Sequence, residues 1–412
     1  MGGMDANEAK QRGTFDPGNV RPMDPPPEAG NGSNPRNGSV AGPQVFDALA
    51  DVWRPICEWG EWLTQTPPRR EYLLTFQPQG TEKDGSPKKP VGVLPLGKAG
   101  MIAAAGAAGK SWAMIQLALS VATGKPWFGF DVSSPGRVLL VLAEEEAQEA
   151  WRRLNTAADA MELSPEERRA ATARVWVVPL AGRNAALTGE EPTLRAPGAP
   201  KHPADGLPVT ALFWEFWERL EQPGEAWRLV VLDPLARMAG LEVEKDNAAA
   251  TRFVQAVEAL TAAPGAPTVL VTHHTNKNSR TQGHATTSDA AAATAARGAS
   301  ALTDGFRWAA SLEPRRRYEG EPELVQLRVV KNNYGGYPPE TELVRRGGPL
   351  TPATSADLAA WKKADKEAKA KTLADAAAVK AEGRRLAKLA KDLEADARED
   401  DTADEADDWT DQ

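Results

Sequence analysis

Short apolar runs alternate with amphipathic stretches between about residues 68 and 345. Apolar runs bounded by turn residues predict strands, and apolar positions that recur every three or four residues predict helices. Continuous apolar strands that alternate with helices indicate an α/β domain with a mainly parallel sheet. The expected strands are 99–106, 137–146, 174–180, 227–238, 267–277, 305–314 and 323–333. The expected helices are 111–124, 146–161, 211–222 and 248–263.

Two segments precede this domain, which we place at 68–350. Residues 1–44 are rich in Gly, Pro and Asn, and they predict a disordered arm. Residues 45–67 hold enough apolar and Trp side chains for a short helix interrupted at Pro55. This helix either docks on a partner or packs on the main domain.

The C-terminal region differs from the domain in its charge pattern. Residues 351–398 are rich in Ala, Lys, Glu and Leu and predict a charged helical extension, with Leu386, Leu389 and Leu393 on one face. An acidic tail at 399–412 holds eight acids and no bases. The whole chain has a net charge of −8, and this tail accounts for all of it, so acids and bases are equal in number in residues 1–398. Local basic patches for nucleic acid therefore remain possible despite the acidic total.

Composition also bounds the class of protein. Cys57 is the single cysteine, which excludes an internal disulfide and a cysteine metal cluster. No apolar run reaches the ~18 residues of a membrane helix, and the N-terminus lacks the apolar core of a secretory signal. The sequence thus predicts a cytoplasmic protein without a membrane partner.

Two stretches interrupt the alternation of strands and helices. Residues 181–208 are rich in Pro and Gly and predict a surface insertion. Residues 276–297 form a long polar loop directly after an expected strand. Loops of this length inside a compact domain are usually functional or disordered.

The stretch "AAAGAAGKSW" at 103–112 has the context of a phosphate-binding loop, because it joins an expected strand to an expected helix. Ala104 stands where the motif G-x-x-x-x-G-K-[ST] has its first glycine. A small side chain is tolerated there if φ is negative. Backbone amides would surround the phosphates, Lys110 would reach the β- and γ-phosphates, and Ser111 would hold Mg²⁺. The alternative is a chance match in an Ala- and Gly-rich stretch. The candidate nucleotide-binding residues are Gly106, Ala107, Ala108, Gly109, Lys110, Ser111, Trp112 and Asp233.

Carboxylates at two strand ends complete the expected site. Asp233 follows the run "LVVL", which is a Walker-B pattern, and it is the second metal candidate beside Ser111; alternatively it caps a turn. Pro234 stands where many P-loop ATPases have a catalytic glutamate. Glu144 is the first acid after the apolar run "VLLVLA", so we expect it to orient the attacking water at the carboxyl edge of the sheet. One of the next two glutamates would cap the following helix.

The run "TVLVTHH" ends with two imidazoles at the same edge. Thr272 or His274 could sense the γ-phosphate, and the alternative is a pair of partly buried histidines bonded to backbone. An arginine from a neighbouring subunit could stabilise the transferring phosphoryl group. Arg307 is the first candidate for that role, with Arg297 and Lys331 after it, and the alternative is a surface salt bridge.

The order of these motifs resembles the RepA-type hexameric replicative helicases of plasmids and phages, which are RecA-like, DnaB-related P-loop ATPases. The resemblance rests on "AAAGAAGKSWAMIQLALSVATGKPWFG", "VLLVLAEEEAQEAWRRL", "LVVLDPLARM", "VLVTHHTNK", "RGASALTDGFRWAASL" and "VVKNNYG". It implies ATP and Mg²⁺ as cofactors and a homo-hexameric ring. It also implies Glu144 as catalytic base, His274 as sensor and Arg307 as the arginine that acts across the interface.

The resemblance implies that basic loops hold single-stranded DNA in a central channel. The candidates are Lys277 and Arg280 in the 276–297 loop, and Arg237 and Lys245 after the Walker-B strand. The loop is equally compatible with a plain linker. The acidic tail could solvate the chain, dock a basic partner through Trp409, or compete with DNA for basic loops.

The function expected from the sequence is an ATP-dependent DNA helicase, ring-forming and translocating on single-stranded DNA during plasmid or phage replication. The resemblance implies 5′ to 3′ movement, and the tails could bind a replication initiator or loader. Two alternatives stay open at this point. One is a RecA-like ATPase that loads or remodels proteins on DNA without unwinding it. The other is a non-catalytic ATP-binding regulatory module.

Overall fold

The computed structural model describes residues 66–407, except for 194, 196–198, 200, 241–242, 244–245 and 275–299. The chain divides into two units, Met1–Pro68 and Arg69–Gln412, and every element named below belongs to the second unit. The expected arm at 1–44 and nearly all of the expected docking helix at 45–67 lie outside the described residues.

Among the described residues, a nine-stranded sheet forms the centre of the second unit. Its strands from β9 to β6 in sheet order are parallel, and β10, β11 and β12 add to it in antiparallel fashion beside β9. The order is β12 (Leu350–Pro352), β11 (Thr341–Arg345), β10 (Glu323–Asn332), β9 (Trp308–Pro314), β3 (Ala99–Ala104), β8 (Thr268–His274), β7 (Trp227–Asp233), β5 (Arg137–Leu142) and β6 (Val175–Pro179). The predicted α/β class with a mainly parallel sheet is confirmed, and the arrangement is a RecA-like P-loop fold.

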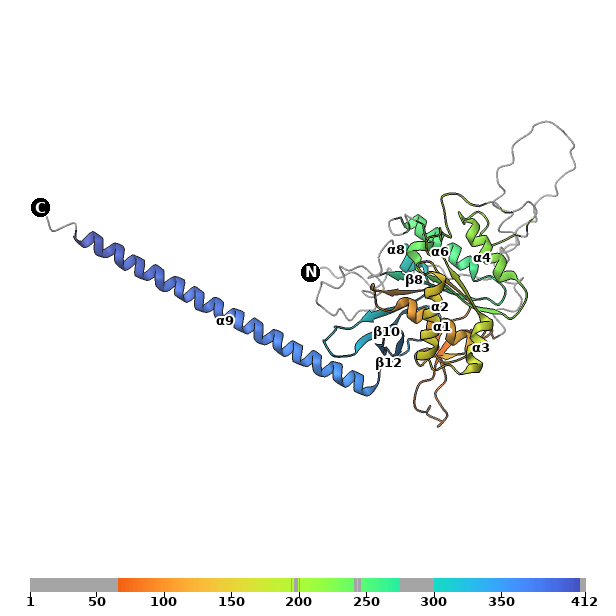
Figure 1. The fold of residues 1–412 in the computed structure, drawn as a ribbon, viewed down its shortest axis with the longest axis horizontal. Helices are drawn as coiled ribbons and strands as arrows, with labels where there is room; N and C mark the ends of the chain where they lie inside the picture. The colour runs from red at the N-terminus through yellow and green to blue at the C-terminus, as the bar shows by residue number, and fades with distance from the viewer. Residues whose placement is uncertain are drawn as a thin grey trace, which may run out of the picture. The chain divides into compact units, whose positions relative to one another are not determined.

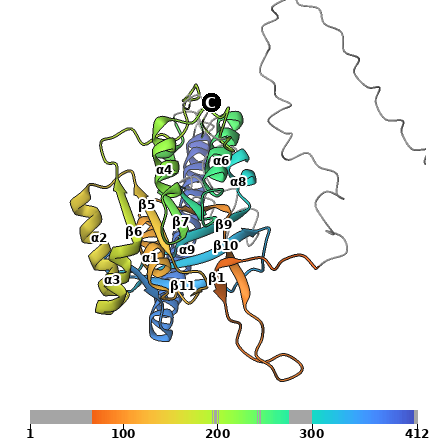
Figure 2. The ribbon, with the colours of Figure 1, turned by 90° about the vertical axis from the view of Figure 1, so that its right-hand side faces the viewer.

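Helices cover both faces of this sheet (Figures 1 and 2). On one face lie α1 (Lys110–Thr123), α2 (Ala147–Ala160) and α3 (Pro165–Arg174). On the other face lie α4 (Ala211–Glu221), α6 (Asn247–Leu260) and α8 (Ser300–Gly305). The sheet is therefore buried on both sides, which explains why its strands are continuously apolar in sequence.

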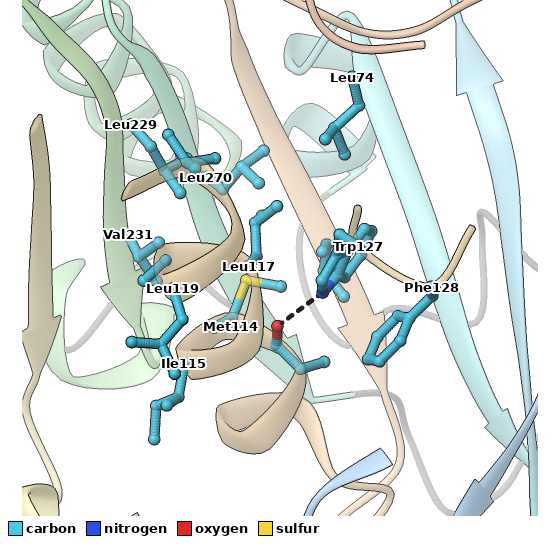
Figure 3. Close-up of a cluster of buried hydrophobic side chains, with 14 of the residues drawn as sticks. Leu74, Met114, Ile115, Leu117, Leu119, Trp127, Phe128, Leu229, Val231 and Leu270 are labelled. Atoms are coloured by element: carbon cyan, nitrogen blue, oxygen red, sulfur yellow. Dashed lines mark hydrogen bonds between the residues drawn. The ribbon is translucent and has the colours of Figure 1, made fainter. Parts of the chain in front are cut away.

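Alternate residues of each central strand enter two separate cores. In β5, Val138 and Leu140 join the cluster under α1, whereas Leu139 and Val141 join the cluster under α4 and α6. Figure 3 shows the first cluster, in which the Trp127 indole donates to the backbone oxygen of Ala113 in α1 over 3.1 Å. This bond ties the loop after α1 to the helix that begins at the phosphate-binding loop.

A smaller sheet packs beside the large one, in the order β2 (Val91–Pro95), β1 (Tyr72–Phe76) and β4 (Asp131–Val132). The buried Trp308 indole of β9 donates to the oxygen of Val93 over 2.7 Å and joins the two sheets. The sequence pattern did not predict this sheet, because its strands are short and only partly buried.

Several predicted strands are too long, and the largest excess is in the strand expected at 227–238. The run 227–238 stops as a strand at Asp233, and a short helix α5 (Leu235–Met238) follows. Leu235 and Met238 are fully buried, so the apolar run continues although the backbone conformation changes. Periodicity alone does not separate a buried strand from a buried helical turn.

The expected surface insertion 181–208 is partly wrong, because it contributes buried side chains to the second core. Leu187 and Ala204 belong to the cluster around α4 and α6. His202 is 8% exposed, and its ring stands edge-on to Trp217 with centroids 3.9 Å apart. The Ala204 amide donates to His202 Nδ1 over 2.9 Å, and burial lowers the pKa of His202. A neutral imidazole thus fastens this segment to α4.

One long helix, α9 (Ser355–Asp407), ends the described chain (Figure 1). Its first turns are attached to the domain, because the Trp361 indole donates to the Arg316 oxygen over 2.9 Å and Tyr318 donates to Asp365. The helix passes without a break through the expected boundary between extension and acidic tail at 398. No helix among the described residues is long and apolar enough to cross a membrane.

Candidate nucleotide site

The loop between β3 and α1 has the conformation that phosphate binding requires. Gly109 is the N-cap of α1 with φ 93°, a left-handed conformation that favours glycine, and Ala107 also has a positive φ of 62°. Ala104 is the last residue of β3 and is not among the described residues with positive φ. The glycine that the backbone needs is therefore present, and the position that lacks one has ordinary strand conformation.

Lys110 lies at the centre of the site. Its side chain is buried, with 6% exposed, and its Nζ is 3.0 Å from His274 Nδ1 and 3.4 Å from the Ala104 oxygen. Burial lowers the pKa of Lys110, and the negative charges of Asp233 and Glu144 oppose that change. A buried ammonium at the end of a phosphate-binding loop is suited to a polyphosphate.

Asp233 and Thr272 meet at the carboxyl ends of two neighbouring strands. β7 and β8 run in parallel with Leu232 beside Val271, so the next residues of the two strands are adjacent. The Thr272 hydroxyl donates to Asp233 Oδ1, and both side chains are buried. Thr272 thereby fixes the orientation of the carboxylate.

Two glutamates after β5 lie beside this pair. β5 ends at Leu142, and the amide of the next residue, Ala143, donates to the Asp233 oxygen over 2.8 Å. Glu144 is half exposed, and its Oε1 is 3.4 Å from Arg237 Nε. Glu146 is the N-cap residue of α2, but its side chain makes no capping hydrogen bond.

Glu145 is more enclosed than Glu144. Its side chain is 13% exposed and pairs with Arg153 Nη1 over 2.5 Å. Burial raises the pKa of Glu145, with Arg153 opposing and the neighbouring carboxylates adding to the rise. The Arg153 guanidinium also lies 5.7 Å from the ring centroid of Trp112 in α1. Sequence reasoning assigned Glu145 no role at the site.

Comparison with known proteins identifies the family from this region. A family model described as an AAA domain matches residues 67–280, which is more than half of the chain. The chain belongs to the AAA domain family. Among solved structures, one described as an ATPase domain is similar with a TM-score of 0.40 and 11% identity, over 62% of this chain and 85% of that one.

The matched AAA domain contains the phosphate-binding loop, Glu144, Asp233 and His274. It is a P-loop ATPase-type domain, which binds a nucleotide, typically with Mg²⁺. Within the described residues no group of three or more His, Cys, Asp and Glu side chains could hold a metal by itself. Mg²⁺ usually takes only one or two protein ligands and completes its shell with phosphates and water. The hydroxyl of Ser111 and the carboxylate of Asp233 fit that pattern.

Arg307 lies at the opposite edge of the large sheet. Trp308, the next residue, pairs in parallel with Gly100 near the start of β3, whereas the phosphate-binding loop follows the end of β3. Lys331 lies near Arg307, and its Nζ donates to the Asp304 oxygen over 3.0 Å. Burial lowers the pKa of Lys331, and the positive charge of Arg307 lowers it further. The structure therefore does not bring Arg307 or Lys331 to the chain's own Lys110.

Arginines that sequence reasoning missed surround the tip of the phosphate-binding loop. Arg345, at the end of β11, donates to the Ala107 oxygen over 2.6 Å. Three consecutive arginines, 315–317, follow β9 and line a groove of about 530 Å³ together with Gly106 and Ala107. The signal was the run "EPRRRYEG" directly after an expected strand, but only the pairing of β9 with β3 places it beside the loop.

The remaining candidates divide into two groups. Arg237 lies in α5 and is exposed beside Glu144. Lys245, Lys277, Arg280 and Arg297 lie outside the described residues.

Proposed function

We propose that this AAA domain protein is an ATP-dependent DNA helicase of the RepA type, which forms a ring and translocates on single-stranded DNA during plasmid or phage replication. One observation carries the proposal. The described residues assemble Lys110, His274 and Asp233 at one edge of the sheet, while the arginine expected to act on the same phosphate is exposed at the opposite edge. This arrangement supports a site that a second copy would complete.

The residues at the carboxyl edge would divide the chemistry among them. Lys110 and the backbone amides of 105–110 would hold the β- and γ-phosphates of ATP. Ser111 and Asp233 would hold Mg²⁺, which neutralises charge on the phosphates. Glu144 would orient the attacking water, because its carboxylate is half exposed at the mouth of the site.

His274 would act as the sensor. Its Nδ1 is within 3.0 Å of Lys110 Nζ, so loss of the γ-phosphate would change the partner of the ammonium and hence of the imidazole. β8 leads from His274 directly into the polar loop 276–297, which carries Lys277 and Arg280. A change at the sensor would thus reach a loop proposed to hold the DNA backbone, with Arg237 as a further contact.

Arg307 would reach the ATP of the neighbouring subunit in a homo-hexamer, with Lys331 or Arg297 as the alternative group. Residues 68–350 would be the ATPase domain. The charged helical extension at 351–398 would follow it. The N-terminal segments and the acidic tail at 399–412 would engage an initiator or loader. A ring of this kind uses hydrolysis at successive interfaces to shift the loops along the strand.

The test is the rate of ATP hydrolysis with and without single-stranded DNA. We expect DNA to raise the rate of the wild-type chain at least several-fold, and Lys110→Ala to remove hydrolysis with and without DNA. A strand-displacement assay on a forked duplex then measures unwinding. Hydrolysis that does not respond to DNA would contradict the helicase function and favour a remodelling ATPase. DNA-stimulated hydrolysis without strand displacement would favour a loader.

A further inference from the structure

The cationic side chains of α9 are sorted both along the helix and around it. Residues 361–391 contain ten Lys and Arg against four acids, whereas residues 392–407 contain nine acids and one Arg. The basic part thus ends abruptly at Lys391. A helix that only needed solubility would mix both signs on its surface.

Eight of the ten cations lie on one side of the helix. At about 100° per residue, they fall within an arc of roughly 120° that runs for about 44 Å along the axis. We call this set the basic stripe; its members are Lys362, Lys363, Lys366, Lys369, Lys380, Arg384, Lys388 and Lys391. The other two cations, Lys371 and Arg385, and acids such as Asp375 and Glu382 lie outside the arc.

The stripe is exposed to solvent along its whole length. Lys369 pairs with Asp365 over 2.7 Å. Lys380, Arg384, Lys388 and Lys391 form no ion pair with any side chain that the structure describes. These four follow one another at nearly one per helical turn, or one per about 5.4 Å. A dense row of like charges is costly through mutual repulsion, and an anionic partner would relieve that cost.

We propose that the basic stripe of α9 binds the phosphate backbone of a nucleic acid strand. The four outer cations form a row at nearly one charge per helical turn, which matches a linear polyanion that is bound through phosphates without sequence preference. The four outer cations occupy consecutive turns with no large apolar side chain among them on that face, whereas a protein interface would bury an apolar centre. The acidic residues from Asp392 onward repel phosphates, so they set the end of the contact.

This site is separate from the ATP site and from the loops proposed to line the ring. The choice of single-stranded DNA as the ligand rests on the proposed function, but binding at the stripe needs neither ATP nor hydrolysis. The stripe would give the protein a second contact with the strand outside the AAA domain match, which ends at residue 280.

The chain itself offers a matched pair of variants. Arg384→Ala with Lys388→Ala removes one Arg and one Lys from the stripe, and Lys371→Ala with Arg385→Ala removes one of each from outside it. Both change the net charge equally, and Ala preserves the helix. The measurement is the affinity of the full chain for a labelled oligo-dT without nucleotide, at several salt concentrations. Circular dichroism checks that both variants keep their helix content.

We expect the stripe variant to lose roughly 5- to 25-fold in affinity near 0.1 M salt and to reduce the salt slope by about 1.4, as two lost phosphate contacts would. The control variant should lose less than 2-fold. Equal losses in both variants would overturn the proposal, since only net charge would then matter. The proposal would also be overturned if the stripe variant bound DNA as tightly as the wild-type chain but had lost binding to poly-glutamate. That result would indicate an acidic protein partner. If the stripe variant loses affinity as expected but DNA does not stimulate ATP hydrolysis, binding at the stripe is supported and the helicase function is contradicted.

Discussion

The carboxyl edge and the amino edge of the large sheet differ in how their charged groups are held. At the carboxyl edge, Lys110 is buried and within hydrogen-bond distance of His274, and the buried Asp233 accepts from Thr272. At the amino edge, Arg307 is exposed. At the first edge, buried charged groups contact one another inside one chain, whereas the second edge exposes a cation to solvent.

The distance between the edges decides what Arg307 can do. β3 spans six residues, from Ala99 to Ala104, and separates the two edges. At about 3.3 Å per residue, this is roughly 20 Å, which a single side chain does not bridge. Arg307 can therefore act on a nucleotide only if that nucleotide is bound by another copy of the chain. Experiments that mix variant copies test whether the two edges work together in this way.

Arg307→Ala is expected to have the largest effect, and it tests whether Arg307 at the amino edge acts on ATP bound at the carboxyl edge of another copy. We expect hydrolysis to fall roughly 10³-fold, as loss of an arginine that stabilises the transferring phosphoryl group does, while ATP affinity stays nearly unchanged. Mixing this variant with inactive Lys110→Ala should restore part of the activity, because some interfaces then combine an intact Lys110 with an intact Arg307. The measurement is steady-state hydrolysis across a series of mixing ratios.

Arg252→Ala is the control for that experiment, since Arg252 is likewise an exposed arginine and lies in α6. It should hydrolyse ATP at the wild-type rate. A mixture that stays inactive at every ratio would show that the two edges do not cooperate between copies. Restoration by Lys331→Ala in place of Arg307→Ala would assign the trans role to Lys331.

Variants of Glu144 and Glu145 test which carboxylate at the carboxyl edge orients the attacking water. We expect Glu144→Gln to lower single-turnover hydrolysis roughly 10²- to 10⁴-fold, as loss of a general base does. Glu145→Gln should lower it less than 10-fold, because Arg153 already holds that carboxylate at 2.5 Å. Glu145 has a raised pKa and a low exposure, so a reversed ranking would identify Glu145 as the base instead.

Much of this arrangement could be predicted from local sequence. The apolar runs located the parallel strands, the Gly-Lys-Ser motif located Lys110, and polar residues at the ends of the apolar runs located Asp233 and His274. The helix α3 was missed although Ser164 and Glu167 form a capping box at its start and Pro165 stands in its first turn. Only Ala171 of α3 is buried, so the helix has no apolar periodicity to detect.

The part of the site that could not be predicted depends on contacts between distant segments. Arg345 reaches the Ala107 oxygen because β11 pairs with β10, and β10 pairs with β9 beside β3. No local pattern encodes that chain of pairings. The packing of Leu187 and His202 into the second core is equally non-local, since a Pro- and Gly-rich composition predicts only a loop.

Arg237→Ala is expected to have the smallest effect, and it tests whether DNA and the carboxyl edge communicate. Arg237 Nε lies 3.4 Å from Glu144 Oε1, and both side chains are largely exposed, with 63% and 50% of their surfaces accessible. An exposed pair of this kind contributes at most about 1 kcal/mol, which corresponds to a change of roughly 5-fold. If Arg237 restrains the base until phosphates of DNA engage the arginine, its removal should raise hydrolysis without DNA by about 2- to 5-fold. The ratio of DNA-stimulated to basal hydrolysis should fall by a similar factor.

Arg237→Lys keeps the charge and should retain most of the stimulation, which separates the effect of the ion pair from the effect of the side-chain shape. An unchanged ratio in Arg237→Ala would mean that the pair with Glu144 is a surface contact without a role in coupling.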